Sequence, residues 1–240
     1  VKGSNDVGGL VGYAINSTIE NSYATGNVNG DNAVGGLVGN ADNITISNCY
    51  ATGDVSGNYD AGGLVGNAHN VTISNCYATG DVSSSNYDAG GLAGNVGSGV
   101  NISDSYATGN VSGNNDVGGL VGYMYSNVAV TISNCYATGN VSGYIEVGGL
   151  VGYASYNITI SNCYATGNVS GDDYIGGLVA YVDSTVTLSD SYATGNVSGD
   201  NDVGGLVGYA YDVSIPDSYA EGDVDGVDYA GGLVGRTESS

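Results

Sequence analysis

The sequence predicts an all-β protein folded as a parallel β-solenoid, or β-helix, with about 27–30 residues and three short strands per turn. The first observation is a nine-fold repeat of Gly-Gly-Leu, with steps of 27, 27, 28, 28, 30, 28, 28 and 27 residues between copies. The second is the phrase Asn/Asp-Ser/Cys-Tyr-Ala, which keeps the same phase. The third is the lack of an i, i+3, i+4, i+7 apolar pattern, which argues against helices.

A unit repeated at such a period stacks on its neighbours in one elongated array. We therefore expect residues 1–240 to form a single solenoid of eight full repeats and a partial terminal repeat, cut from a longer array. A leucine-rich horseshoe fits the period but lacks its helix and leucine spacing here. A propeller blade needs four strands and more residues.

The strands can be placed within one repeat. Residues 71–74 read Val-Thr-Ile-Ser, an apolar/polar alternation typical of a half-buried strand, and close equivalents stand at 44–47, 130–133, 158–161 and 186–189. Residues 76–79 and 81–83 indicate a second strand with a bend at Gly80. Gly-Gly-Leu-Val-Gly is expected to be a third, short strand whose glycines allow close backbone approach.

Stacked turns would bring equivalent residues into columns about 4.8 Å apart. Three aliphatic columns are expected to form the interior. They are Leu10, Leu37, Leu64, Leu92, Leu120, Leu150, Leu178, Leu206 and Leu233; Ile19, Ile46, Ile73, Ile102, Ile132, Ile160, Leu188 and Ile215; and Val28, Val55, Val82, Val111, Val141, Val169, Val197 and Val224.

The charge balance excludes several classes of partner. The chain has 24 acidic residues against two basic ones, Lys2 and Arg236, for a net charge of -22. Nucleic acid and anionic membrane surfaces need a basic footprint that is missing. No run of 18 apolar residues is present, so no membrane insertion is expected in this segment.

The repeats resemble the GLUG motif, which is named for its Gly-Leu-aliphatic-Gly core. Gly-Gly-Leu-Val-Gly occurs seven times, with variants at Gly90 and Gly176, and Ser-Tyr-Ala-Thr-Gly-Asn-Val follows downstream. The resemblance implies a secreted scaffold of the kind found in large surface adhesins. It carries over no catalytic residue.

An acidic column precedes most of the glycine pairs by two residues. It consists of Asp6, Asp60, Asp88, Asp116, Glu146 and Asp202. One interpretation is a solvated acidic edge, where salt screens the repulsion. The other is a row of Ca²⁺ sites, since Ca²⁺ binds carboxylate, amide and carbonyl oxygens. No other cofactor is expected.

All four cysteines fall in one column, immediately before the repeat tyrosine. Stacked turns would place paired Cα atoms near 5 Å, within the range that a disulfide accepts. We therefore expect Cys49–Cys76 and Cys135–Cys163 bridges, in keeping with an oxidising compartment. The alternative is that cysteine and serine are interchangeable small residues here.

Two further columns carry polar groups. The repeat tyrosines are expected to stack along the axis, facing either the interior or a sugar-binding surface. They are Tyr23, Tyr50, Tyr77, Tyr106, Tyr136, Tyr164, Tyr192 and Tyr219. Asn-X-Ser/Thr sequons make a set of glycosylation candidates: Asn16, Asn43, Asn70, Asn101, Asn110, Asn140, Asn157, Asn168 and Asn196.

The alternating strand also predicts an outward double row of small hydroxyls, including Thr45 with Ser47 and Thr72 with Ser74. Such a row resembles the face of ice-binding solenoids, although threonine is also a good strand residue on any solvent face.

Catalytic activity is not expected, because the two basic residues stand at opposite ends and His69 is the single histidine. We expect a non-catalytic extracellular scaffold: a surface adhesin, surface-layer component or filament subunit. Its partners would be copies of itself, stacked end to end or laterally, or cell-surface glycans. An ice-binding solenoid and a Ca²⁺-stabilised carbohydrate-binding module are the alternatives.

Overall fold

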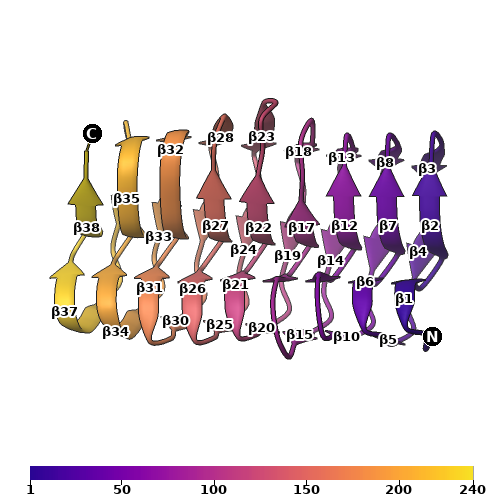
Figure 1. The fold of residues 1–240 in the computed structure, drawn as a ribbon, viewed down its shortest axis with the longest axis horizontal. Helices are drawn as coiled ribbons and strands as arrows, with labels where there is room; N and C mark the ends of the chain where they lie inside the picture. The colour runs from indigo at the N-terminus through magenta and orange to yellow at the C-terminus, as the bar shows by residue number, and fades with distance from the viewer. Residues whose placement is uncertain (240) are drawn as a thin grey trace.

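The computed structural model describes residues 1–239 as a parallel β-solenoid without a helix (Figure 1). The predicted fold class is confirmed. Eight complete turns stack along one axis, and a ninth contributes its first strands. Each strand pairs in parallel with the same strand of the next turn, so that Tyr50 pairs with Tyr77 and Ile46 with Ile73.

Each turn contributes to three sheets. The strands before the glycine pairs are β1 (Asn5–Gly8), β6 (Asn32–Gly35), β11 (Ala61–Gly62), β16 (Ala89–Gly90), β21 (Asn115–Gly118), β26 (Ile145–Gly148) and β31 (Asp173–Gly176). Those after the pairs are β2 (Val11–Ile15), β7 (Val38–Asp42), β12 (Val65–His69), β17 (Ala93–Val96), β22 (Val121–Tyr125), β27 (Val151–Ser155) and β38 (Val234–Glu238).

The alternating strands are β3 (Thr18–Glu20), β8 (Thr45–Ser47), β13 (Thr72–Ser74), β18 (Asn101–Ser103), β23 (Val130–Ser133) and β28 (Ile158–Ser161). The tyrosine strands are β4 (Tyr23–Ala24), β9 (Tyr50–Ala51), β14 (Tyr77–Ala78), β19 (Tyr106–Ala107), β24 (Tyr136–Ala137), β29 (Tyr164–Ala165), β33 (Tyr192–Ala193) and β36 (Tyr219–Ala220).

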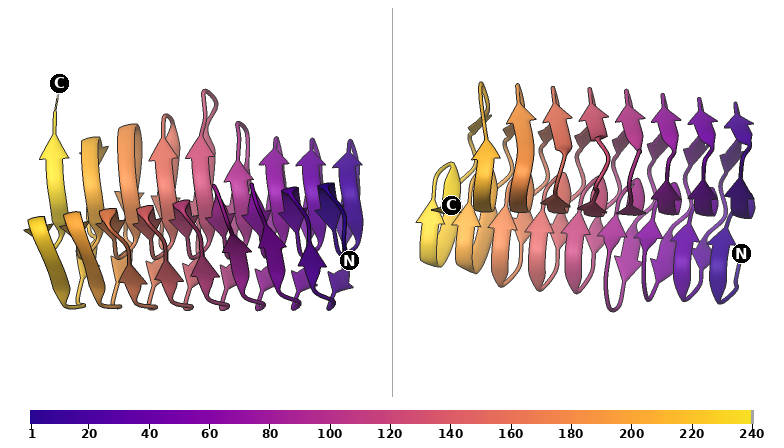
Figure 2. Two further views of the ribbon diagram at one scale, coloured as in Figure 1. Left: turned by 60° about the horizontal axis from the view of Figure 1, so that its bottom comes forward. Right: turned by 45° about the horizontal axis from the view of Figure 1, so that its top comes forward.

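The valine strands that close each turn are β5 (Val28–Asn29), β10 (Val55–Gly57), β15 (Val82–Ser84), β20 (Val111–Ser112), β25 (Val141–Ser142) and β30 (Val169–Ser170). Near the C-terminus neighbouring strands merge into β32 (Val179–Ser189), β34 (Val197–Gly204), β35 (Val207–Ser214) and β37 (Val224–Gly231). The two views of Figure 2 show the same stacking from either side of the axis.

Two aliphatic cores fill the turns. The larger core lies between the strands after the glycine pairs and the alternating and tyrosine strands, and contains Leu64, Val65 and Ile73. The smaller core joins the valine strands to the strands before the glycine pairs, as Val55 and Ala61 illustrate. The three predicted columns are buried in the middle turns. In the end turns Leu10 is 49% exposed, because no further turn covers it.

The Gly-Gly-Leu segment differs from the sequence prediction. It is the bend between two strands rather than a strand of its own, because β6 ends at Gly35 and β7 begins at Val38. The bend leaves no space for side chains: a Cβ on Gly62 would lie 1.9 Å from the carbonyl oxygen of Val65, and one on Gly63 would lie 2.1 Å from that of Gly91. The motif glycines are therefore required by close backbone approach.

Candidate functional site

The side of each turn formed by the alternating, tyrosine and valine strands presents rows of hydroxyl groups to solvent. We call this surface the hydroxyl face. It consists of Thr45, Ser47, Tyr50, Thr52 and Ser56 with their equivalents in the other turns. Period-two alternation positions them, since Ile46, Ala51 and Val55 point into the cores.

The tyrosine row resolves the orientation that the sequence left open. Its rings are partly exposed while the adjacent alanines are buried, so the phenols point outward. Successive rings lie nearly parallel, with centroids 4.7 Å apart for Tyr106–Tyr136 and 5.1 Å apart for Tyr192–Tyr219. Each inner ring is covered on both faces by its neighbours. Between its two end rings the row therefore offers ring edges and phenol hydroxyls, and no open ring face for a sugar to stack on.

The middle of the hydroxyl face is free of ionisable carboxylates and basic groups. The segments 106–112, 131–142 and 159–170 contain no Asp, Glu, Lys or Arg, although the chain carries a net charge of -22. Three acidic residues border the patch on this face: Asp81, whose carboxylate accepts a hydrogen bond from the Asn110 N–H at 2.8 Å, Asp104 and Asp190. Acidic side chains are instead concentrated at the turns and on the opposite side.

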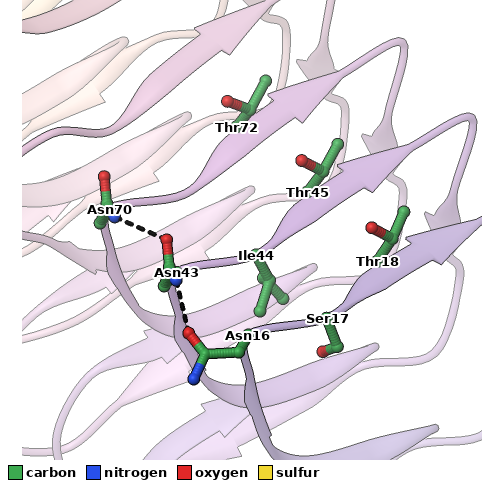
Figure 3. A pocket seen from close by; sticks show the side chains of 8 residues that line it. All are labelled: Asn16, Ser17, Thr18, Asn43, Ile44, Thr45, Asn70 and Thr72. Atoms are coloured by element: carbon green, nitrogen blue, oxygen red, sulfur yellow. Dashed lines mark hydrogen bonds between the residues drawn. The ribbon is translucent and has the colours of Figure 1, made fainter.

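A hollow at the solenoid edge adjoins this face (Figure 3). Thr18, Thr45 and Thr72 stand in a row beside it, and an asparagine ladder runs along its rim. The Asn43 amide donates to Asn16 Oδ1 at 2.5 Å, and the Asn70 amide donates to Asn43 Oδ1 at 2.8 Å. Glycosylation of Asn43 or Asn70 would replace one hydrogen on the nitrogen that makes these bonds and attach a sugar within the ladder.

A second set of sequons has a different geometry. The backbone N–H of Asn140 donates to Asn110 Oδ1 at 3.0 Å, and that of Asn168 donates to Asn140 Oδ1 at 2.9 Å. Because the side-chain oxygen makes the bond, the amide nitrogen of these exposed residues is left available for a glycan. Glycosylation stays a prediction, better suited to Asn140 and Asn168 than to Asn43 and Asn70.

The acidic column lies on the opposite side, where the strands before and after the glycine pairs meet at an angle. We call this line the elbow. Asp60, Asp116 and Glu146 adopt left-handed backbone conformations, with φ of 38°, 50° and 57°. Asp88 is 6% exposed and Asp116 is 9% exposed. The interpretation as a solvated acidic edge is therefore wrong for Asp88 and Asp116, whose side chains are buried at the elbow.

The buried carboxyl groups are one another's neighbours. Asp60, Asp88, Asp116 and Glu146 occupy four consecutive turns, and side-chain hydrogen bonds join Asp60 to Asp88 and Asp116 to Glu146. The Asn95 amide donates to Asp88 Oδ2 at 2.8 Å, and the Asn67 amide donates to Asp60 Oδ2 at 3.4 Å. We call these four residues the carboxyl ladder.

Burial makes the ladder hard to ionise. Burial and the neighbouring Asp116 raise the pKa of Asp88 to about 8, and burial and the bond to Glu146 raise the pKa of Asp116 to about 9. Burial also raises the pKa values of Asp60 and Glu146. The raised pKa values of Asp88 and Asp116 favour their protonated forms near neutral pH.

The geometry does not favour the predicted Ca²⁺ row. In residues 1–239, no group of three His, Cys, Asp or Glu side chains converges as a cation site would require. Asp6 lies outside the ladder, beyond Ala33, and accepts a hydrogen bond from Asn40 at 3.1 Å. Asp202 also lies outside it, beyond Tyr174, and is 5% exposed. Its carboxyl group is near Arg236.

The predicted disulfides are wrong: all four cysteines are free and buried. Tyr77 N–H bonds to Cys49 O, so adjacent cysteines are in register at strand spacing, about 4.8 Å, but the Cys49 thiol donates to Ser47 O at 3.1 Å and is not bonded to the next sulfur. The Cys76 thiol instead donates to Ser74 O at 3.2 Å. Ser105 Oγ makes the same bond to Ser103 O at 2.7 Å. Cysteine and serine are therefore interchangeable in this column.

One surface constellation contains catalytic residue types. Asp42, His69 and Ser98 line the same shallow hollow at the solenoid edge. His69 Nδ1 lies 3.3 Å from Asp42 Oδ1, but both side chains are substantially exposed. The Ser98 hydroxyl accepts a hydrogen bond from Ser126 Oγ at 3.1 Å. Within residues 1–239 no hydrogen bond joins Ser98 to the imidazole, so the nucleophile–base contact of a triad is not formed.

The comparisons with known proteins identify the repeat. The family model of the GLUG motif matches residues 3–29, 30–56, 57–83, 113–142 and 143–170, which is more than half of the chain. The chain belongs to the GLUG-motif family. Searches of curated proteins and of solved structures gave no match.

The GLUG motif is a structural unit in this chain. Each matched segment spans one turn, from one valine strand to the next, and the unmatched turns continue the same columns. Its invariant features are the bend glycines and the buried leucine. The sequence did not reveal the hydrogen-bond partners of the carboxyl ladder, Asn67 and Asn95. Each stands seven residues after its acidic partner, Asp60 or Asp88, and only the folded elbow brings the two side chains together.

Proposed function

We propose that this chain is a non-catalytic extracellular scaffold that adheres to neutral polysaccharides through its hydroxyl face. A GLUG-repeat solenoid is compatible with a structural or adhesive role outside the cell. The described residues contain no helix long and apolar enough to cross a membrane. The observation that carries the proposal is the uncharged middle of the hydroxyl face in a strongly acidic protein.

The chemistry of this patch suits a polyhydroxyl partner. Phenol, threonine and serine hydroxyls both donate and accept hydrogen bonds, as sugar hydroxyls do. A basic partner would be attracted to the acidic turns rather than to this patch, and an acidic polymer would be repelled by the net charge. The patch also lacks the contiguous apolar surface typical of protein–protein cores.

Repetition compensates for weak individual contacts. Hydroxyl contacts exchange bonds with water for bonds with the partner, so each contributes little. The middle turns repeat nearly the same groups at strand spacing, and a polymer lying along the axis would engage many of them at once. Affinity should therefore rise steeply with the length of the glycan.

A binding assay with matched charge variants tests the proposal. The probes are neutral glucans, mannans and chitin oligosaccharides of increasing length. Thr138→Glu with Thr166→Glu places two carboxylates on exposed positions of the patch, and we expect at least a tenfold loss of affinity. Asn86→Glu with Asn114→Glu adds the same charge at exposed turns and should bind as the wild type does.

Equal binding by the two double variants would overturn the assignment of the face. Failure of the wild-type protein to bind any neutral polysaccharide on the panel would overturn the proposed function itself.

The row of Thr18, Thr45 and Thr72 favours ice as a second candidate ligand, because it places like hydroxyls in register along a regular strand ladder (Figure 3). This candidate predicts thermal hysteresis that disappears when Thr45 and Thr72 are replaced by tyrosine. Wild-type protein without thermal hysteresis would exclude it.

A further inference from the structure

We propose that the carboxyl ladder of Asp60, Asp88, Asp116 and Glu146 is a pH-dependent contact. When protonated it holds together the two rows of strands that meet at the elbow, and as the pH rises it lets them separate. This inference concerns the opposite side of the solenoid from the hydroxyl face. It does not depend on what the hydroxyl face binds.

The first step is the geometry. The strands that carry the ladder pair in register, with Ala61 opposite Ala89, Ala89 opposite Val117 and Val117 opposite Val147. The backbones of consecutive ladder residues are therefore held one strand spacing apart, about 4.8 Å, which brings their carboxyl groups into one row. Ala33 ends the row on one side and Tyr174 ends it on the other. Four acids in consecutive turns form an uninterrupted line.

The second step is the surroundings. The elements packed against the ladder are β12, β17, β22 and β27, which present Asn67, Asn95, Tyr123 and Tyr153. None of these side chains is basic. The two basic residues of the chain stand in its first and last turns. No cation of the protein can neutralise the ladder, so closure depends on bound protons.

The third step is the consequence of ionisation. Like charges at strand spacing in a part-buried line repel strongly, and two of these carboxyl groups lie nearly out of water. The repulsion acts across the elbow and along the stack. Separating the two strand rows at the elbow, so that water reaches the carboxylates, relieves it.

The direction of the pH effect follows from linkage. The pKa values of the ladder are raised in the folded state, to about 8 for Asp88 and about 9 for Asp116. The stability contributed by each group is therefore complete below the ordinary carboxyl pKa, and it is lost as the pH rises through the raised value. Between these limits the folding equilibrium constant should fall roughly tenfold per pH unit for each such group.

The experiment compares thermal unfolding from pH 4 to pH 10 for three proteins. We expect the wild-type midpoint to fall continuously between pH 5 and pH 9. Asp88→Asn with Asp116→Asn keeps neutral hydrogen-bonding groups in the column and should flatten this slope. Asp172→Asn with Asp200→Asn removes the same charge from exposed turns and should keep the wild-type slope.

An unchanged slope in the ladder variant would overturn the proposal. A direct measurement covers the case in which that variant does not fold. Carbon-13 NMR of the wild-type carboxyl groups should show at least two of them titrating above pH 7. If all of them titrate in the ordinary carboxyl range, the proposal is wrong.

Discussion

At the scale of single residues, the fold depends on positions where two backbones approach more closely than a Cβ atom allows. The glycine that bends the chain after each tyrosine strand is one such position. A Cβ on Gly80 would lie 2.2 Å from the carbonyl oxygen of Gly53 in the preceding turn. Gly26 occupies the same column in the first turn, where a Cβ would meet nothing within 4 Å.

This pair gives a matched prediction. Gly80→Ala forces two turns apart and should lower the free energy of unfolding by about 1–3 kcal/mol. Gly26→Ala makes the same chemical change without a clash and should change it by less than about 0.5 kcal/mol. Urea unfolding followed by circular dichroism measures both. Equal losses would show that the glycine column acts through backbone flexibility instead of close approach.

The burial of part of the acidic column is a feature that the sequence did not predict. The period placed Asp88 and Asp116 in one column, and that placement is correct. It did not predict the burial of Asp116, because the left-handed backbone conformation of that residue reverses the side that strict alternation assigns to its side chain. The sign of φ at such a residue depends on contacts with the neighbouring turn, and a local sequence pattern carries no information about those contacts.

At the scale of one structural element, the cysteine–serine column forms polar ladders inside the solenoid. The Cys49 N–H donates to Cys76 Sγ at 3.4 Å, and the Cys76 N–H donates to Ser105 Oγ at 3.1 Å. The Cys76 side chain thus accepts a hydrogen bond from a buried N–H of the preceding turn and donates one to a carbonyl of its own turn. The requirement is for a small group that both donates and accepts.

The ladder predicts an order of stability for substitutions at Cys76. Cys76→Ser keeps both bonds and should cost less than about 1 kcal/mol, whereas Cys76→Ala leaves the Cys49 N–H unpaired and should cost about 1–3 kcal/mol. Denaturant unfolding under reducing conditions compares the two. A serine variant less stable than the alanine variant would contradict the proposed role.

The strands themselves were largely predictable from the sequence. The alternation at 71–74 and the tyrosine strand with its glycine bend appear as β13, β14 and β15. The bend at Gly-Gly-Leu was not predicted, because a short apolar run flanked by glycines fits a strand equally well. The missing disulfides have a similar cause: columns fix Cα spacing, but bridging also depends on the direction of the Cβ bonds.

At the scale of the whole molecule, each turn contacts mainly the turn before it and the turn after it. The columns are in register from the first turn to the last, so the turns are interchangeable units. Stability in such an array is a sum over turns and the interfaces between them. The stacked hydrogen bonds make a stiff rod.

Removing one whole turn tests this modularity. Deletion of residues 57–83 joins Ser56 to Ser84 in the register that already relates Gly57 to Ser84. The product should fold cooperatively and be shorter by one strand spacing, about 4.8 Å. Small-angle scattering and thermal unfolding measure both properties. Deletion of residues 70–83 removes half a turn and should abolish cooperative unfolding; equal behaviour of the two deletions would refute the modular description.

The parallel phenol rings also give the molecule a built-in optical label. The chain contains 21 tyrosines and no tryptophan, so the near-ultraviolet spectrum belongs to tyrosine alone. Eight of those chromophores are stacked in one line, where their electronic transitions couple through space. Separation of any two turns breaks that line, and the loss of coupled circular dichroism reports the event without an added dye.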